Sequence, residues 1–321
     1  MAIYPSLCPR LMTEADLGFA DLLRGIVGWN QTLNDWQRLR DYAPQGCFIA
    51  EWNGSPVGTA TTTRYGTELA WIGMLLVHPD YRGRGVGRAL LEHCLNHLKG
   101  TPCIKLDATP LGQTLYDKLG FEVEWTLTRW ECKCFVESAA PHVPGREHLQ
   151  TQSNDADVAL TRGAGRGSPE PLVIPHESVT LKSLNASSVT QLDEIDSRAF
   201  GVSRAAMLER LVVGSSRALA AISQNGKVRG YGLLRAGSKA SYLGPIVADT
   251  AIGVALVKSL LNQEKGRPVY WDVPDVNGMA ASLAQELGFA PQRHLVRMFL
   301  GTNKQPGNPA QCFAIADPSI G

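Results

Sequence analysis

Hydrophobic and polar positions along the chain form two series of predicted elements in the same order. Apolar residues three and four positions apart indicate amphipathic helices, and short apolar runs bounded by turn residues indicate strands. In the first half, helical patterns cover residues 17–39 and 86–98, and strand patterns cover 47–50, 70–77 and 104–107. The second half has helical patterns over 189–213 and 253–263 and strand patterns over 218–222, 241–247 and 269–272. The sequence therefore predicts an α/β fold with a mixed sheet, built twice.

Two short motifs recur in both halves and support an internal duplication. An Asn-Gly pair follows an apolar run at 53–54 and at 225–226, and this pair favours hairpin turns because both turn residues need a positive φ. A Leu-Gly-Phe tripeptide follows at 119–121 and at 287–289, where the glycine ends a helix and the phenylalanine enters a strand. The first motif recurs after 172 residues and the second after 168. Nearly constant offsets indicate one domain repeated.

Length and composition divide the chain into two domains and a linker. The 321 residues are about twice the usual ~150 residues of one domain. Residues 138–176 contain five prolines, four glycines and no Phe, Trp or Tyr, so they offer little apolar surface to offset the entropy of ordering. We expect domains over 1–137 and 177–302, a flexible linker over 138–176 and a C-terminal tail over 303–321.

The charge balance and the cysteines exclude several classes of partner and site. Lys and Arg number 31 against 30 Asp and Glu, so neither nucleic acid nor a membrane surface is an expected partner. No run approaches ~18 apolar residues and the start lacks the features of a signal peptide, so we expect a cytoplasmic location. The pair Cys132 and Cys134 has the wrong spacing for zinc. We expect both cysteines on one buried face of a strand, and no bound metal.

A glycine-rich loop between a strand and a helix carries the main chemical signal. The apolar strand stops at Pro79, glycines stand at positions 83, 85 and 87, and a helix begins near Val86. These glycines let backbone N–H groups converge at the positive end of the helix dipole, an arrangement that favours a phosphate or pyrophosphate. Arg82, Arg84 and Arg88 add full positive charges around the same place.

The glycine spacing distinguishes between the known phosphate loops. A Rossmann loop needs Gly or Ala where Arg88 or Leu90 stands, and a P-loop needs a Gly-Lys-Ser/Thr sequence that is missing. Arg82, Gly85 and Gly87 instead form R-x-x-G-x-G, which resembles the acetyl-CoA-binding motif of the GNAT acetyltransferase superfamily. The resemblance implies two tandem domains, each a mixed, mostly antiparallel sheet flanked by helices, with acetyl-CoA as co-substrate and no metal. It implies cofactor contacts at Leu75, Leu76, Val77, Arg82, Gly83, Arg84, Gly85, Val86, Gly87, Arg88 and Thr109.

A second feature of the superfamily lies downstream of the loop. Leu115-Tyr116 before the tripeptide at 119–121 resembles the family's strand–helix segment, and the resemblance places Tyr116 where many members carry a tyrosine that meets the CoA sulfur. We expect Tyr116 to be catalytic, as the group that protonates or hydrogen-bonds the leaving thiolate. The N–H of Val77 is the expected oxyanion donor, because Pro79 cannot extend the strand ladder. Thr109 stands where the family commonly has Asn.

The general base and the acceptor stay open at this point. Glu68, Asp107 and His78 are candidate bases, and deprotonation of the amine through water is an equal alternative. Large and amide side chains at 28–31 and 36–37 interrupt the first helical pattern, and the resemblance places this region over the acetyl group. A pocket of Trp and amide groups favours a neutral or modestly polar amine, in a small molecule or a peptide. The sequence leaves the oligomeric state open.

The second half lacks the signals of a phosphate site. Thirteen residues lie between Gly73 and Gly87, but only eight lie between their counterparts, Gly244 and Gly253, and the missing residues correspond to the loop. Ala284 stands where the first half has its tyrosine. We therefore expect a degenerate GNAT-like domain that shapes the structure or the substrate site. The predicted function is an acetyl-CoA-dependent N-acetyltransferase that acts on a primary amine in a ternary complex; a non-catalytic acyl-CoA-binding sensor or interaction module is the alternative.

Overall fold

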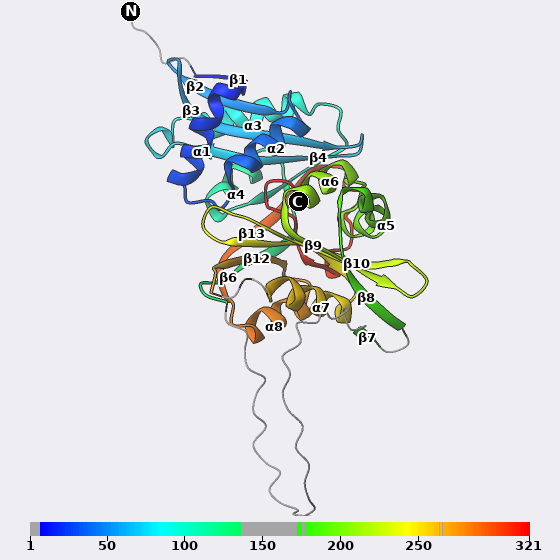
Figure 1. Cartoon of the computed structure of the whole chain (residues 1–321). Coiled ribbons are helices and arrows are strands. Elements are labelled where there is room, and N and C mark those ends of the chain that lie inside the picture. The colour runs from blue at the N-terminus through cyan, green and yellow to red at the C-terminus, as the bar shows by residue number, and fades with distance from the viewer. Residues whose placement is uncertain (1–6, 136–171, 175–176, 263, 265) are drawn as a thin grey trace, which may run out of the picture.

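A computed structural model describes residues 7–135, 172–174, 177–262, 264 and 266–321, which form two halves of the same element order (Figure 1). The first half contains β1 (Leu7–Leu11), α1 (Leu17–Ile26), α2 (Leu33–Tyr42), β2 (Cys47–Trp52), β3 (Ser55–Tyr65), β4 (Leu69–Val77), α3 (Val86–His97), β5 (Cys103–Ala108), α4 (Pro110–Asp117) and β6 (Glu122–Cys132). The second half contains β7 (Leu172–Ile174), β8 (Glu177–Ser183), α5 (Val189–Phe200), α6 (Ala205–Val213), β9 (Ser215–Ser223), β10 (Val228–Arg235), β11 (Ser241–Ala248), α7 (Thr250–Leu261), β12 (Val269–Pro274), α8 (Gly278–Glu286), β13 (Ala290–Gly301) and β14 (Cys312–Ala314). The duplicated order predicted from the hydrophobic pattern is confirmed. Among the described residues, no helix is both long enough and apolar enough to span a membrane.

Both long helical patterns are interrupted in the structure. The pattern over 17–39 forms α1 and α2, because Gly28 takes a φ of 76° and Thr32 caps a new helix by accepting the N–H of Asp35. The pattern over 189–213 forms α5 and α6, separated at Gly201 with a φ of 110°. Glycine adopts this left-handed conformation at little cost. All four helices pack on the same core, so each pattern has an apolar face on both sides of its break.

The strands of the two halves form one continuous 14-stranded sheet. Its order is β1-β2-β3-β4-β5-β13-β6-β12-β11-β10-β9-β8-β7, with β14 paired to β11. The halves exchange their last long strands: β13 of the second half lies between β5 and β6, and β6 pairs with β12. Only β4–β5 and β11–β12 are parallel pairs within this sheet of described residues. The mixed, mostly antiparallel sheet is confirmed, and each half depends on a strand from the other.

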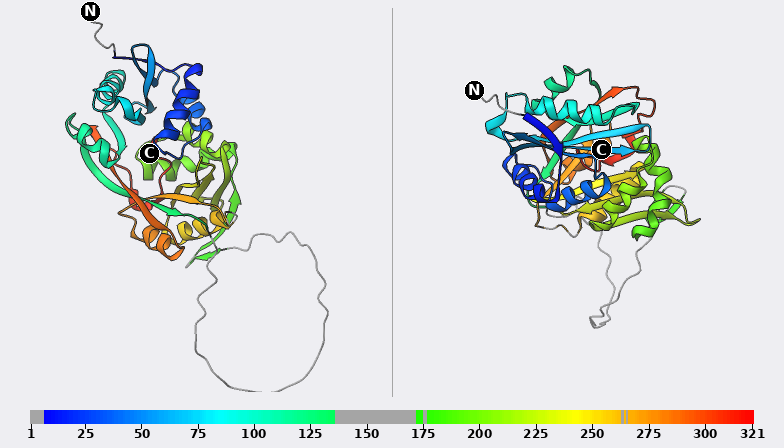
Figure 2. Two further views of the ribbon diagram at one scale, coloured as in Figure 1. Left: turned by 90° about the vertical axis from the view of Figure 1, so that its left-hand side faces the viewer. Right: turned by 90° about the horizontal axis from the view of Figure 1, so that it is seen from above.

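The domain boundaries expected from the sequence differ from those in the structure. Residues 172–174, expected in the linker, form β7 and pair with β8, whereas linker residues 138–171 and 175–176 lie outside the described residues. Residues 303–321, expected as a tail, include β14 and continue to the centre of the molecule between the two halves (Figures 1 and 2). There, Tyr65 Oη donates to the carbonyl of Ile320 at 2.7 Å. The C-terminal segment is therefore part of the folded core.

Two cores lie on opposite faces of the first half, and β4 separates them. Trp71 packs with α1 and α2, whereas Ala70 and Ile72 pack with α3, as the alternation of side chains along a strand requires. The alternation shifts at a β-bulge where Met74 takes a φ of 48°. Beyond the bulge, Met74 faces the α1–α2 side and Leu75 faces the α3 side. Bulges of this kind re-aim the side chains that follow them.

One cysteine departs from its expected position. Cys132 is the last residue of β6 and is buried, but Cys134 is exposed. The expectation that both cysteines share a buried strand face is wrong for Cys134, because the strand ends two residues before it.

Candidate active site

A cavity of about 840 Å³ lies where β4 and β5 separate. The two strands pair in parallel over 69–71 and 103–105, and no further pairing between them occurs within the described residues. The cavity therefore occupies the opening of a V, in which the edge of each strand faces the space between them.

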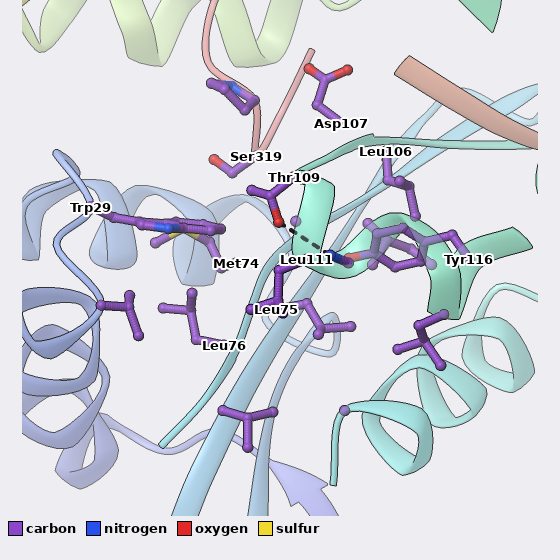
Figure 3. A pocket seen from close by; sticks show the side chains of 18 of the residues that line it. Trp29, Met74, Leu75, Leu76, Leu106, Asp107, Thr109, Leu111, Tyr116 and Ser319 are labelled. Atoms are coloured by element: carbon purple, nitrogen blue, oxygen red, sulfur yellow. Dashed lines mark hydrogen bonds between the residues drawn. The ribbon is translucent and has the colours of Figure 1, made fainter. Parts of the chain in front are cut away.

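Side chains from both faces of the sheet line this cavity (Figure 3). Leu115 and Tyr116 come from the α3 side, and Met74 and Trp29 come from the α1–α2 side. In Figure 3, Trp29 and Met74 lie together on one side of the cavity, and Tyr116 lies on the other. Two ligands can therefore approach the same point from opposite faces of the sheet.

The glycine loop turns the chain from β4 into α3 at one end of the cavity. Gly83 and Gly85 have left-handed φ values of 72° and 84°, which glycine adopts with little strain. Gly85 is the N-cap of α3, so the first N–H groups of this helix have no acceptor within it. An added Cβ at either glycine would meet no atom within 4 Å. Glycine is needed at both positions for its backbone conformation, not for lack of space.

Every residue expected to contact acetyl-CoA lines the cavity except Arg84. The Arg84 guanidinium lies over two aromatic rings instead, 5.3 Å from the centroid of Tyr81 and 5.8 Å from that of Trp52. Arg82 Nε donates to the carbonyl of Val77 at 3.3 Å, which draws the loop against the end of β4. Thr109, also at the cavity, is the N-cap of α4.

The backbone N–H of Val77 points to the open side of β4. The N–H of His78 donates to the carbonyl of Val57 at 2.8 Å, and hydrogen-bonded residues alternate along an antiparallel pair. The N–H of Val77 therefore points away from β3, toward the space from which β5 has separated. A strand N–H in this position can donate to a carbonyl oxygen held in the cavity.

Tyr116 lies on α4 with a largely buried ring at the cavity wall (Figure 3). Burial raises the pKa of its hydroxyl to about 12, so this group is protonated at neutral pH. The ring occupies the space beside Gly112, one helical turn earlier, where an added Cβ would lie 2.9 Å from Tyr116 Cε2. Gly112 thus leaves room for the ring, and the protonated hydroxyl can donate to a developing anion.

Of the three candidate bases, only Asp107 lines the cavity. Glu68 is exposed at the turn before β4, and His78 Nδ1 accepts the N–H of Asp80 at 3.4 Å. Both oxygens of Asp107 accept hydrogen bonds from Arg297 at 2.8 Å. Burial raises the pKa of Asp107, and the Arg297 guanidinium opposes that shift.

The segment between α1 and α2 contributes Trp29 and Gln31 to the cavity. Asn30 instead joins the halves, because its side-chain amide exchanges hydrogen bonds with backbone groups just before β11. Trp36 is fully buried in the core and Gln37 is exposed. Of the large and amide side chains expected near the acceptor, two therefore reach the cavity.

The second half also contributes side chains to the cavity, which the sequence did not predict. Arg293 and Leu295 on β13, and Pro318 and Ser319 in the C-terminal segment, line the same cavity. Ser319 packs directly on β4, since a Cβ at Gly73 would lie 2.2 Å from the Ser319 carbonyl oxygen. These residues reach the cavity through the exchange of β13 and the path of the C-terminal segment. Both are long-range features, so no local sequence pattern indicates them.

The equivalent opening in the second half is filled by the chain itself. There, β11 and β12 pair in parallel over 241–243 and 269–271, and β14 then pairs with the later residues of β11. Asn277 Nδ2 donates to the carbonyl of Cys312 at 3.1 Å, which holds the start of β14. The Phe313 ring lies against α7. An extended segment of polypeptide thus occupies the opening that the first half leaves as a cavity.

Each half matches a family of GNAT acetyltransferases. Residues 19–121 match the Acetyltransferase (GNAT) family and residues 192–314 match the Acetyltransferase (GNAT) domain. The chain belongs to the GNAT superfamily. It is an acyltransferase with two GNAT domains in tandem, which confirms the predicted fold class and family.

Similar proteins span nearly the whole of this GNAT chain. An uncharacterized N-acetyltransferase, YitH, from Bacillus subtilis is 24% identical over 301 residues, which cover 93% of each protein. A holothin acyltransferase from a Pseudoalteromonas species is 24% identical over 91% of this chain and 87% of its own length. The crystal structure of a putative acetyltransferase from Pyrococcus horikoshii has the same fold, with a TM-score of 0.75 and 20% identity over 100% of this chain and 98% of that one.

Proposed function

We propose that this GNAT protein transfers the acetyl group of acetyl-CoA to a primary amine at a single site in the first half. The observation that carries the proposal is the open V between β4 and β5 beside the glycine loop. In the second half, β14 fills the equivalent V as an added strand. An opening that accepts an extended polypeptide in one half fits an extended pantetheine arm in the other.

Residues of the glycine loop and of β4 bind the cofactor. N–H groups at the start of α3 bind the pyrophosphate, because they lack helical acceptors and carry the positive end of the helix dipole. Arg82 and Arg88, both at the cavity, add charge-assisted hydrogen bonds. Leu75 and Val77 present the free edge of β4 to the pantetheine arm.

Direct attack of the amine nitrogen on the thioester carbonyl forms the C–N bond and breaks the C–S bond. The N–H of Val77 stabilises the negative charge on the carbonyl oxygen, and Tyr116 donates its proton or a hydrogen bond to the leaving thiolate. Water takes the amine proton, since both oxygens of Asp107 already accept from Arg297. Catalysis in this proposal uses groups of the first half only.

Calorimetric titration with acetyl-CoA tests the binding site. We expect one site per chain and loss of binding in Gly85→Glu, which places a charged side chain at the cavity. Gly66→Glu is the matched control, because Gly66 also has a left-handed φ and open surroundings but lies at the turn before β4. Two equivalent sites, or binding retained in Gly85→Glu, would contradict the proposal.

Thiol release from acetyl-CoA across a panel of primary amines tests the transfer. Amine-dependent release at saturating acetyl-CoA supports the enzyme. Tight binding without release for any amine would instead favour an acyl-CoA sensor.

A further inference from the structure

The acceptor side of the cavity contains an arginine without an acidic partner. Arg293 and Arg129 are directly opposite each other on β13 and β6, so both side chains leave the same face of the sheet, and both line the cavity. Arg129 forms an ion pair with Asp272, whose two oxygens accept its Nε and Nη2 at 2.7 and 2.6 Å. Arg293, in contrast, forms no ion pair within the described part of the chain, and its Nε donates to the neutral Gln292.

The surroundings of Arg293 disfavour its positive charge. Arg293 is half-buried, and burial together with the nearby charge of Arg129 lowers its pKa, although the charge of Asp272 opposes this shift. A guanidinium that is partly desolvated and repelled by a second one gains most from an anionic ligand. The cavity therefore offers a guanidinium with which no carboxylate of the described residues forms an ion pair.

The position of Arg293 separates it from the proposed phosphate site. Side chains alternate along β13, and Arg297, on the same face as Arg293, lies 4.4 Å from the ring centroid of Trp71, which belongs to the α1–α2 core. Met298 points the other way, into the core with α3. The glycine loop begins α3, so Arg293 lies on the opposite face from the loop, where the acceptor would enter.

A second unsatisfied group lies on the same face. Gln31 lines the cavity and is buried, and its Nε2 donates to both oxygens of Asp317 at 3.0 and 3.1 Å. Its Oε1 has no hydrogen-bond partner among the described residues. A buried acceptor of this kind is costly unless a ligand supplies an N–H. The α1–α2 face thus presents one unused cation and one unused acceptor.

We infer that the acceptor is an amine that carries a free carboxylate, as in an amino acid, with the carboxylate bound by Arg293 and an N–H bound by Gln31 Oε1. This inference rests on the proposed function and specifies its substrate class. Arginine matches a carboxylate with two parallel N–H donors. The neutral amine favoured by the Trp and amide side chains at 28–31 would leave Arg293 unpaired.

Matched acceptors test the inference by turnover. Proteinogenic amino acids are compared with their carboxamides, which keep the amine and remove the negative charge. We expect the free acids to be preferred, and Arg293→Ala to raise their KM about 10- to 100-fold, the scale of a lost charged hydrogen bond, with little change for the amides. Arg293→Lys should recover part of the effect. Arg198→Ala, on the exposed surface of α5, is the control for removing an arginine.

Binding of reaction products tests the inference without turnover. N-acetyl amino acids and N-acetyl amino acid amides are titrated into the full chain with CoA present, and calorimetry measures binding. We expect the acids to bind, the amides to bind weakly, and Arg293→Ala to abolish the difference. Equal binding of acids and amides, or binding by none of the acids, would overturn the inference. A failure of the proposed function differs from this result, because it appears as missing thiol release while selective binding of the acids persists.

Discussion

Tyr116 is the residue on which the proposed chemistry depends most directly. Burial raises the pKa of its hydroxyl to about 12, so the protonated, donating form persists well above neutral pH. In Tyr116→Phe we expect kcat to fall about 10- to 1000-fold, the scale of a lost general acid. The Kd for acetyl-CoA should stay nearly unchanged, because the ring remains. Because a raised pKa shifts ionisation upward, wild-type kcat should show no alkaline loss from this group below about pH 10. An unchanged kcat in the variant would show that Tyr116 has only a structural role.

Gly112 positions Tyr116 because its missing side chain leaves room for the tyrosine ring. A Cβ at this position would lie 2.9 Å from Tyr116 Cε2 and 3.3 Å from its hydroxyl oxygen, so Gly112→Ala must displace the ring. We expect a fall in kcat that approaches that of Tyr116→Phe, and no further fall in the double variant, since the two changes remove the same donor. Gly18→Ala is the control, because Gly18 lies in α1 with open space around it. Additive losses in the double variant would show that Gly112 acts elsewhere.

At the scale of elements, buried ion pairs fix the exchanged strands. Asp107 on β5 binds Arg297 on β13 through both oxygens, and Arg129 on β6 binds Asp272 on β12. Each pair joins a strand of the first half to a strand of the second. The register that brings Arg293 and Leu295 to the cavity is therefore set by contacts between the halves.

Removal of one partner of such a pair should be costly. In Asp107→Asn the free energy of unfolding should fall by about 3–5 kcal/mol, because Arg297 remains buried without a counter-charge. Asp107→Asn with Arg297→Met should recover part of this loss. Urea denaturation measures both variants. Glu286→Gln, which breaks the exposed pair with Lys258, is the control and should change stability by less than about 1 kcal/mol. An equal effect of Asp107→Asn and the control would show that the pair does not hold the strands.

At the scale of the whole molecule, the two domains of the duplication have become one folding unit. β13 lies between β5 and β6, and one core contains residues of both halves, such as Tyr65 and Phe200, whose ring centroids are 5.0 Å apart. The halves therefore cannot separate without breaking the ladders on both sides of β13.

Cleavage between the halves tests this unity. A protease site placed within residues 145–170 leaves every described strand intact. We expect the two fragments to elute together in size-exclusion chromatography and to separate only in denaturant, with acetyl-CoA binding retained. Fragment 1–137 expressed alone should not fold stably, because β5 and β6 would lose the strand between them. Separation of the fragments in native buffer would show two independent domains.

Local signals in the sequence determined the elements, the duplication and the glycine loop that lines the cavity. Apolar spacing predicts helices and strands because each element buries one face. Positive φ restricts the turn at Asn53 and Gly54 and the loop at Gly83 and Gly85 to particular residues. The position of Tyr116 at the cavity was predicted because it lies just before the Leu-Gly-Phe tripeptide at 119–121. The break at Gly28 coincides with the interruption of the helical pattern at 28–31, but only the structure shows that one helix ends there and at Gly201 and that a second helix follows.

Only the tertiary structure decided which residues of the second half reach the cavity and that the two halves form one unit. Strand exchange depends on pairing between residues nearly two hundred positions apart, such as Asp107 with Arg297, and no local pattern encodes the choice of partner strand. The same exchange carries Arg293 to the cavity, and the return of the C-terminal segment carries Ser319 there. Likewise, the shorter segment between Gly244 and Gly253 predicts that the second half lacks a phosphate site, and only the fold shows that β14 fills the equivalent opening. The physical reason is that backbone propensities act over a few residues, whereas burial and sheet pairing select among partners along the whole chain.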